Sequence, residues 1–357
     1  MDSQTEQAEQ PPHQTRLPEH KYPVLSLPNE IVSEIFIQCI PPYPVCPPLR
    51  GPSSPTSLTY ICRKWRDIAL TTPQLWRAIT FGDYRTPPVW LERSGSCPLS
   101  ICWMESNDRE TWLPLNPNSL AVLLLHRERW EYVNLTFGNR LKLVLLEGPM
   151  ALLAELSLRM EFGFDQYGPT HAKACEFPRL RTLSLDSFRV IHMGDWLPWT
   201  QLTSLTLANM NPSAYRSALQ SAVNLIHLKT IDCNHDDEDR LPDITLPRLE
   251  TLIMIDSEGY IIQTLGAFIV PSLHTLQLPG SFLDNDPIDA FASFVSKSGC
   301  RLRKVLVTGG LWGDSKSAFR LRFPEIPQIA FNSQYEWFAR QDGDEDDHSS
   351  DSDSESE

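Results

Sequence analysis

The residues that could support catalysis are dispersed along this chain of 357 residues and do not fall at catalytic spacings. There is no GxSxG nucleophile turn, no phosphate-binding P-loop and no GxGxxG turn, and the nine histidines form no cluster. The eight cysteines lie too far apart for a zinc knuckle, and a chain of this length needs no disulfide staples. We therefore expect a protein that is not an enzyme, with no catalytic residues, no metal and no cofactor.

Two features come nearest to a chemical site. The run His235–Asp239 is rich in oxygen ligands, but calcium loops space their ligands around a glycine turn, so we interpret the run as a solvated loop. Cys62 lies on an apolar helical stripe, which favours packing or docking over a reactive thiol. An enzymatic activity in the repeat domain would need a pocket of converging polar groups, which the sequence does not show.

Composition indicates a globular protein with polar ends. The hydrophobic content of 41% is ample for a core, and the net charge of −14 is concentrated in residues 341–357, which hold nine carboxylates. Without a dense basic stripe, nucleic acid is not an expected partner, and no apolar stretch of about 18 residues predicts a membrane span. The start of the chain lacks the pattern of a secretory leader, so we expect a cytoplasmic or nuclear protein. Residues 1–23 and 341–357 are expected to be disordered.

Apolar spacing predicts a small helical unit over residues 24–80. The first helix is expected over 28–40, the second from residue 56 or 57 to residue 69, and a short third piece over 72–76. Between the first two lies a proline-rich insertion, 41–55, whose seven prolines predict an extended loop without regular structure.

From about residue 128 the sequence repeats itself. The repeated pattern LxxLxL recurs at intervals of 22 to 29 residues, which nearly matches the period of leucine-rich repeats, in which this pattern supplies one strand per turn. The segments begin at Trp130, Leu153, Leu180, Leu202, Leu225, Leu249, Leu273 and Leu302.

These repeats predict an α/β solenoid of curved parallel strands backed by helices over residues 128–335, preceded by a connecting region, 81–127, with a first repeat or cap. Asn211-Pro212 and Asp286-Pro287 each combine a helix cap with a first-turn proline and open amphipathic runs. The alternative is an ordinary doubly wound sheet. The unbroken period favours the solenoid.

The helical unit resembles an F-box. The resemblance rests on LPNEIVSEIFIQCI at 27–40 followed by LTYICRKWRDIALTTPQLWRAI at 58–79, and the insertion is its departure from the compact form. With the repeats behind it, the chain is similar to F-box proteins with C-terminal leucine-rich repeats from mushroom-forming fungi. The residues in F-box positions are Leu27, Pro28, Glu30, Ile31, Ile35, Phe36, Cys62, Arg63, Trp65, Leu75 and Trp76.

This resemblance implies an adaptor. The F-box would bind the Skp linker subunit of a cullin-based (SCF) ubiquitin ligase, and the repeats would hold a protein substrate for the ligase. Two alternatives stay open: a helical unit that merely caps the repeat stack, and a scaffold that binds the linker outside the cullin ligase. The expected linker contacts are Leu27, Pro28, Ile31, Ile35, Phe36, Cys62, Trp65, Leu75 and Trp76.

Substrate contacts are expected from strand positions that alternate with the core leucines, because these point to the opposite, concave face. Their mixed chemistry favours a protein or peptide partner over a single charged ligand. The candidates are Arg159, Asp186, Thr206, His227, Lys229, Ile253, Gln277 and Lys304, and the same alternation also exposes Glu155, Ile255, Thr275 and Leu306.

Overall fold

A computed structural model gives the fold of the chain. It describes residues 23–81, 88–104, 117–137, 148–160, 176–187, 197–233, 243–256, 265–283, 286–309 and 315–332. The two ends expected to be disordered, apart from Pro23, and the acidic run 235–239 lie outside these residues.

The helical unit has its first and third pieces near the positions that the sequence predicted, but the second helix is split. Its elements are the 3-10 turn η1 (Pro23–Ser26), α1 (Asn29–Gln38), α2 (Pro55–Leu58), α3 (Arg63–Leu70) and the 3-10 turn η2 (Pro73–Trp76). The single helix expected from residue 56 or 57 to residue 69 is wrong, because a second cap, at Cys62, interrupts it. The Ser54 hydroxyl accepts from the backbone N–H of Thr56, and the Cys62 sulfur accepts from that of Trp65. A new helix therefore starts after Cys62.

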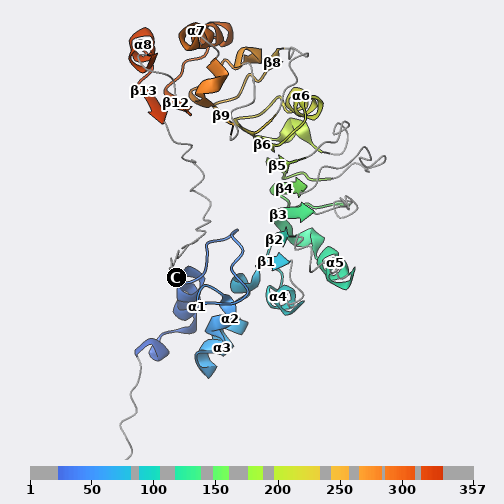
Figure 1. Cartoon of the computed structure of the whole chain (residues 1–357). Helices are drawn as coiled ribbons and strands as arrows, with labels where there is room; N and C mark the ends of the chain where they lie inside the picture. The colour runs from blue at the N-terminus through green and yellow to red at the C-terminus, as the bar shows by residue number, and fades with distance from the viewer. Residues whose placement is uncertain are drawn as a thin grey trace, which may run out of the picture.

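Eleven parallel strands form one sheet in the order of the sequence (Figure 1). This order is compatible with a solenoid and contradicts a doubly wound sheet, in which strand order reverses. The strands are β1 (Ala78–Phe81), β2 (Leu99–Met104), β3 (Trp130–Phe137), β4 (Glu155–Met160), β5 (Thr182–Asp186), β6 (Ser204–Ala208), β7 (His227–Ile231), β9 (Thr251–Ile255), β11 (Thr275–Pro279), β12 (Lys304–Thr308) and β13 (Gln328–Asn332). The sheet thus begins about fifty residues before the repeats do, because β1 and β2 lack the LxxLxL pattern.

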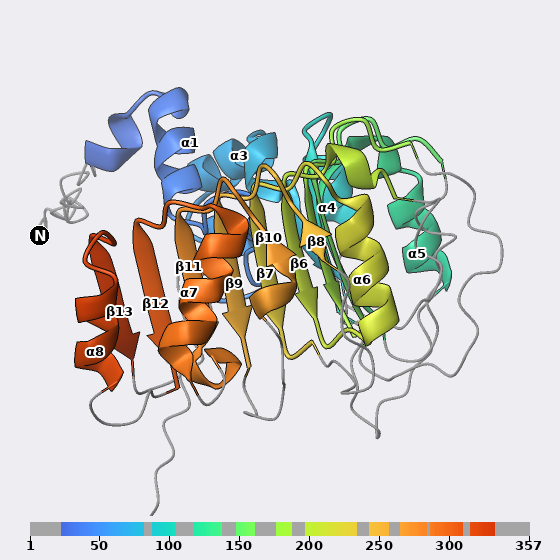
Figure 2. The same ribbon diagram turned by 90° about the horizontal axis from the view of Figure 1, so that it is seen from above.

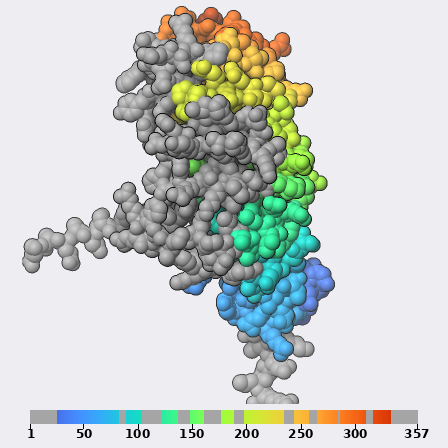
Figure 3. All heavy atoms as spheres, turned by 90° about the vertical axis from the view of Figure 1, so that its right-hand side faces the viewer, coloured from blue at the N-terminus to red at the C-terminus, as the bar shows by residue number. Residues whose placement is uncertain are grey.

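The sheet bends into an arc, with strands on its inner side and helices on its outer side (Figures 1 and 2). The space-filling view of the outer side shows the described residues following one another along the arc in sequence order (Figure 3). The outer elements are α4 (Pro88–Arg93), α5 (Pro117–Leu124), α6 (Pro212–Ser221), α7 (Pro287–Ser298) and α8 (Ser315–Arg322), with 3-10 turns η3 (Arg127–Arg129), η5 (Trp199–Gln201), η6 (Leu265–Ala267) and η7 (Gly280–Leu283).

Within the residues that the structure describes, an α-helix does not follow every strand, which differs from a uniform strand–helix repeat. In the described parts of the two connections flanking β9, the short strands β8 (Ile244–Thr245) and β10 (Phe268–Ile269) pair with each other in a separate parallel sheet. Two paired strands satisfy each other's backbone groups as a helix would internally, so the outer layer stays hydrogen-bonded.

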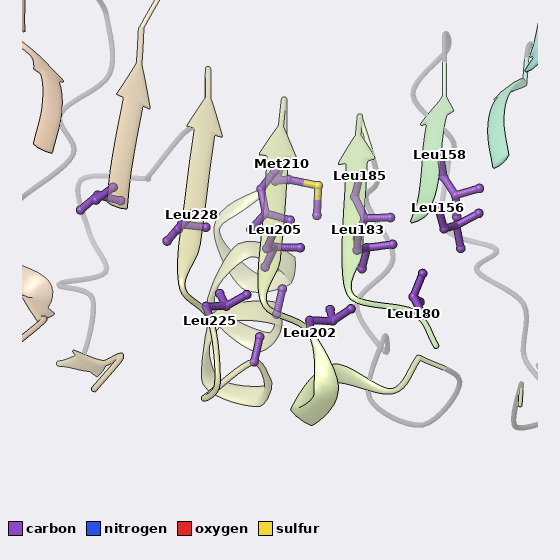
Figure 4. Close-up of a cluster of buried hydrophobic side chains, with 14 of the residues drawn as sticks. Leu156, Leu158, Leu180, Leu183, Leu185, Leu202, Leu205, Met210, Leu225 and Leu228 are labelled. Atoms are coloured by element: carbon purple, nitrogen blue, oxygen red, sulfur yellow. The ribbon is translucent and has the colours of Figure 1, made fainter. Parts of the chain in front are cut away.

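The core consists of leucine rows that run from strand to strand (Figure 4). The three pattern positions of each repeat are buried, as the pattern predicted, with Thr230 taking the third position in the segment that begins at Leu225. In register, the second residues of four neighbouring strands form one row: Leu156, Leu183, Leu205 and Leu228. Buried leucines at equivalent positions stack on one another across the 4.8 Å strand spacing, so each repeat is stabilised by its neighbours. One apolar cluster extends from Val32 in the helical unit to Ile326 before β13.

The predicted cap of α6 provides a local test of the fold. The Asn211 side chain accepts from the backbone N–H of Ala214 at 2.8 Å, and Pro212 occupies the first turn. We expect Asn211→Ala to lower the free energy of unfolding by about 1 kcal/mol, because that N–H loses its partner. Asn211→Asp should retain most of the stability. Urea denaturation measures both, and equal stability of Asn211→Ala and the wild type would contradict the cap.

Candidate functional site

The helical unit exposes a group of apolar side chains on its surface. On α1, Ile31 is 50% and Ile35 is 41% exposed, and their spacing of four residues places them on one face of the helix. Tyr60 and Ile61, between α2 and α3, are 76% and 58% exposed. Leu25, Pro28 and Val45 are further exposed apolar residues of this unit.

Three of the expected linker contacts are instead core residues. Phe36 and Leu75 are each 1% exposed and Trp76 is fully buried. Phe36 packs edge-on against Trp65, with 4.9 Å between ring centroids. These side chains have no surface to offer a partner, because the unit packs both against itself and against the sheet.

Trp76 joins the helical unit to the sheet layer. Its indole N–H donates to the backbone carbonyl of Ala69 at 2.8 Å, and its ring meets Trp90 of α4 edge-on at 5.4 Å. The Arg93 guanidinium lies 4.5 Å from the centroid of the Trp76 ring. The tryptophan is therefore a structural joint.

Three further expected contacts, Leu27, Cys62 and Trp65, are half-buried. Leu27 and Trp65 pack against the core with part of their surface, and Cys62 caps α3. The Lys64 ammonium donates to the carbonyls of Leu25 and Leu27 at 2.7 and 3.3 Å, which fastens the segment before α1 to the start of α3.

The proline-rich insertion packs against the start of the sheet. The Tyr43 hydroxyl donates to the Glu131 carboxylate at 2.8 Å, its ring meets Tyr132 of β3 edge-on at 5.3 Å, and the Arg77 guanidinium lies 3.8 Å from the ring centroid. Further along, the Ser100 hydroxyl of β2 donates to the Pro44 carbonyl at 2.6 Å. The sequence identified a loop here but gave no sign of this contact, since none of these residues forms a motif.

The insertion occupies the concave side of the first strands. Ser100 and Tyr132 are register partners on the face opposite to the leucines, and the Cys46 sulfur lies 3.8 Å from the Ser100 hydroxyl oxygen. Burial raises the pKa of the Cys46 thiol, against the lowering effect of hydrogen bonds to Ser100 and Thr80. The open part of the concave face therefore begins beyond β3.

The Tyr43 contact gives a pH-dependent prediction. Burial, then the hydrogen bond and the charge of Glu131, raise the pKa of the Tyr43 phenol well above its ordinary value. The folded protein thus holds this proton more tightly than the unfolded chain, so the stabilisation is complete below about pH 10 and is lost as pH rises further. Tyr43→Phe should cost about 1–2 kcal/mol at pH 7, and its deficit relative to the wild type should shrink above pH 10.

Urea denaturation at pH 7 and from pH 9 to 11 measures this change. Tyr60→Phe is the control, because Tyr60 is 76% exposed and its substitution should leave the free energy of unfolding unchanged at each pH. A Tyr43→Phe deficit that is absent at pH 7, or constant through pH 11, would contradict the assigned contact.

Strand register places all eight expected substrate residues on the concave face. Thr206 pairs in register with Lys229, and Ile253 with Gln277, while His227 and Lys304 belong to a parallel row near the strand starts. They are not equally accessible. Gln277 is 8% exposed, and so is Leu306, its register partner on β12. Both are corrected to buried positions, because side chains on the inner side of a curved sheet crowd one another.

The carboxyl ends of β4 and β5 hold a polar cluster. The Arg159 Nε donates to Asp186 Oδ2 at 2.7 Å, and Asp186 Oδ1 accepts from Asn209 Nδ2 at 2.8 Å and from the Ser187 hydroxyl at 3.1 Å. The Arg159 side chain is 61% exposed and that of Asp186 is 16% exposed. The sequence predicted Arg159 and Asp186 as separate candidates. That they form a pair became evident only from the register of β4 with β5. It missed Ser187 and Asn209, which follow their strands with positive φ angles.

An isoleucine block lies on the same face at β7 and β9. Ile231 pairs in register with Ile255, and Lys229 pairs with Ile253. The three isoleucines are half-buried but do not belong to the apolar core cluster. Ile231 was missed, although the alternation that marked His227 and Lys229 also includes it.

The described residues contain no group of three or more histidine, cysteine or acidic side chains placed to hold a metal ion. Among them, no helix combines the length and apolar character that crossing a bilayer requires. A comparison of the chain with known protein families and with curated proteins finds no match.

Proposed function

We propose that this protein is a non-catalytic adaptor of a cullin-type ubiquitin ligase. Its helical unit acts as an F-box that binds the Skp-type linker, and its sheet acts as a leucine-rich-repeat domain that binds a protein substrate. The sequence resemblance at 27–40 and 58–79 names the partner.

The observation that carries the proposal is the placement of exposed apolar side chains. Among the described residues, ten large hydrophobic side chains are exposed, and six of them lie between Leu25 and Ile61: Leu25, Ile31, Ile35, Val45, Tyr60 and Ile61. Such side chains are costly in water when they gather in one small unit, and they are typical of a surface that a partner covers. These exposed side chains support docking over capping. The side chains that join the unit to the rest of the fold, such as Trp76, are other residues, so capping does not account for the exposed ones.

The insertion supports an adaptor of fixed geometry. Tyr43 and Pro44 tie the helical unit to β2 and β3 through their contacts with Glu131 and Ser100, and Trp76 ties it to α4. Contacts on two sides of the unit oppose rotation about a single hinge. A substrate on the concave face would then be held at a set distance from the linker.

Reconstitution tests this proposal. The tagged full chain is co-expressed with a Skp-type linker and a cullin, and the complex is separated by size-exclusion chromatography. We expect all three proteins in one peak. Purification of the chain without bound linker would overturn the proposal.

The same experiment separates the alternative function. A scaffold outside the ligase would yield a stable complex with the linker that never contains cullin. The half-buried Leu27, Cys62 and Trp65 do not decide between the two, because both functions use the same linker contact.

A further inference from the structure

The concave face changes character between β4 and β9. From β3 to β6 its middle row consists of small polar side chains, Asn134, Ser157, Ser184 and Thr206, and the row nearest the strand ends holds the Arg159–Asp186 pair. At β7 and β9 these rows hold Ile231, Ile253 and Ile255 beside Lys229, and Ala208 of β6 precedes Ile231 in the end row. A polar region and an apolar region thus adjoin on one open surface.

Arg159 is held in a fixed direction by the polar cluster. Its Nε donates to Asp186, whose carboxylate is itself held by Asn209 and Ser187. Among the described residues, the terminal nitrogens of Arg159 make no hydrogen bond, and 61% of the side chain is exposed. A guanidinium oriented in this way presents its planar fork to a carboxylate at low entropic cost.

The isoleucine block, Ile231, Ile253 and Ile255, leaves apolar surface open on the concave face. The isoleucines are half-buried and lie outside the core cluster, whereas the same positions on β4 to β6 hold Ser157, Ser184, Thr206, Arg159, Asp186 and the small Ala208. Burial of such side chains by a partner is favourable by about 25 cal/mol per Å² of apolar surface.

The spacing between the two features matches an extended peptide. Arg159 and Ile231 lie in the same row three strands apart, about 14 Å at the usual strand spacing, and Ile255 lies one strand further, at about 19 Å. In an extended chain, positions four and six residues from a given residue lie about 13 and 20 Å away, and all three side chains point the same way.

We propose that the concave face binds an extended protein segment carrying a carboxylate side chain with apolar side chains four and six positions away. The carboxylate meets the Arg159 fork, and the apolar side chains cover the isoleucine block. This inference rests on the proposed function, whose substrate class it names. In the chain's own residues 333–357, no carboxylate has apolar side chains both four and six positions away, which favours an external partner.

Fluorescence anisotropy with labelled synthetic peptides tests the proposal on the full chain. The probes are GDSTSITIG and its reversed sequence GITISTSDG, since either chain direction places the side chains alike. The controls are the same peptides with Asn for Asp, and with Ser for both Ile residues. We expect one probe to bind saturably and at least tenfold more tightly than each of its controls. The advantage of Asp over Asn should shrink at high salt.

Variants of the protein identify the surface. Arg159→Ala should weaken the Asp probe at least tenfold and leave the Asn control peptide unchanged, whereas Arg179→Ala removes an equal charge from an exposed loop position and should have no effect. Ile255→Thr keeps the branched shape and should weaken both peptides equally. Thermal melting verifies that each variant is folded.

Three results would overturn the inference. These are no saturable binding of either probe up to millimolar concentration, equal binding of Asp and Asn peptides, and an Arg159→Ala variant that binds like the wild type. A fourth concerns the chain's own tail: if replacing its nine carboxylates by amides tightens probe binding tenfold or more, the tail is the occupant. Unchanged binding supports an external segment. Linker binding is measured separately, so the two proposals can fail independently.

Discussion

Replacing Trp76 with alanine is expected to destabilise the protein by about 3–5 kcal/mol. The side chain is fully buried, and its removal leaves a cavity between η2 and α4 where the Trp90 ring loses its partner. The Ala69 carbonyl also loses the indole N–H that donates to it at 2.8 Å. Urea denaturation of the full chain measures the change.

Tyr60→Ala is the matched control for this prediction. It removes an aromatic side chain of the same helical unit that is 76% exposed, so stability should change by less than about 0.5 kcal/mol. A Trp76→Ala cost below about 1 kcal/mol would contradict the assignment of Trp76 as the joint between the helical unit and the sheet. The prediction matters for function. If Trp76→Ala destabilises the protein as expected, weak linker binding by this variant would reflect unfolding and would not identify Trp76 as a linker contact.

The leucine pattern predicted the repeat core well because it is a local signal. Each LxxLxL segment specifies its own strand and buried face, and Leu183, Leu205 and Leu228 lie in one register row as the period required. The helix caps at Asn211 and Asp286 could also be predicted from the sequence, because each cap bonds to a backbone N–H only three residues further along the chain. The parallel α/β architecture and the concave positions followed from these signals.

The remaining features depend on contacts between distant residues. Tyr43 and Glu131 are 88 positions apart, so the insertion could be identified as a loop but not placed on the sheet. The sequence does not show whether Phe36, Leu75 and Trp76 are core or surface residues, because a large apolar residue on a helical stripe can pack in the core or face a partner. The split at Cys62 was hidden by apolar spacing that continues through the break.

Ile31→Asp combined with Ile35→Asp should abolish linker binding without unfolding the protein. Both side chains are at least 41% exposed on one face of α1, so the charges stay hydrated in the free chain. In a complex they would be buried without partners, which we expect to weaken binding at least 100-fold, about 3 kcal/mol or more. Phe36→Asp is unsuitable for this purpose, because the buried ring supports α1 and its loss would unfold the unit.

Isothermal titration of the full chain with a purified Skp-type linker tests the central claim most directly. The matched control is Val223→Asp with Leu321→Asp, two exposed apolar residues of the outer layer, 41% and 83% accessible. We predict equal 1:1 binding by the wild type and the control, and at least 100-fold weaker binding by the α1 double variant with an unchanged melting temperature. A wild-type chain that does not bind the linker, or an α1 double variant that binds it as tightly as the wild type, would contradict the account.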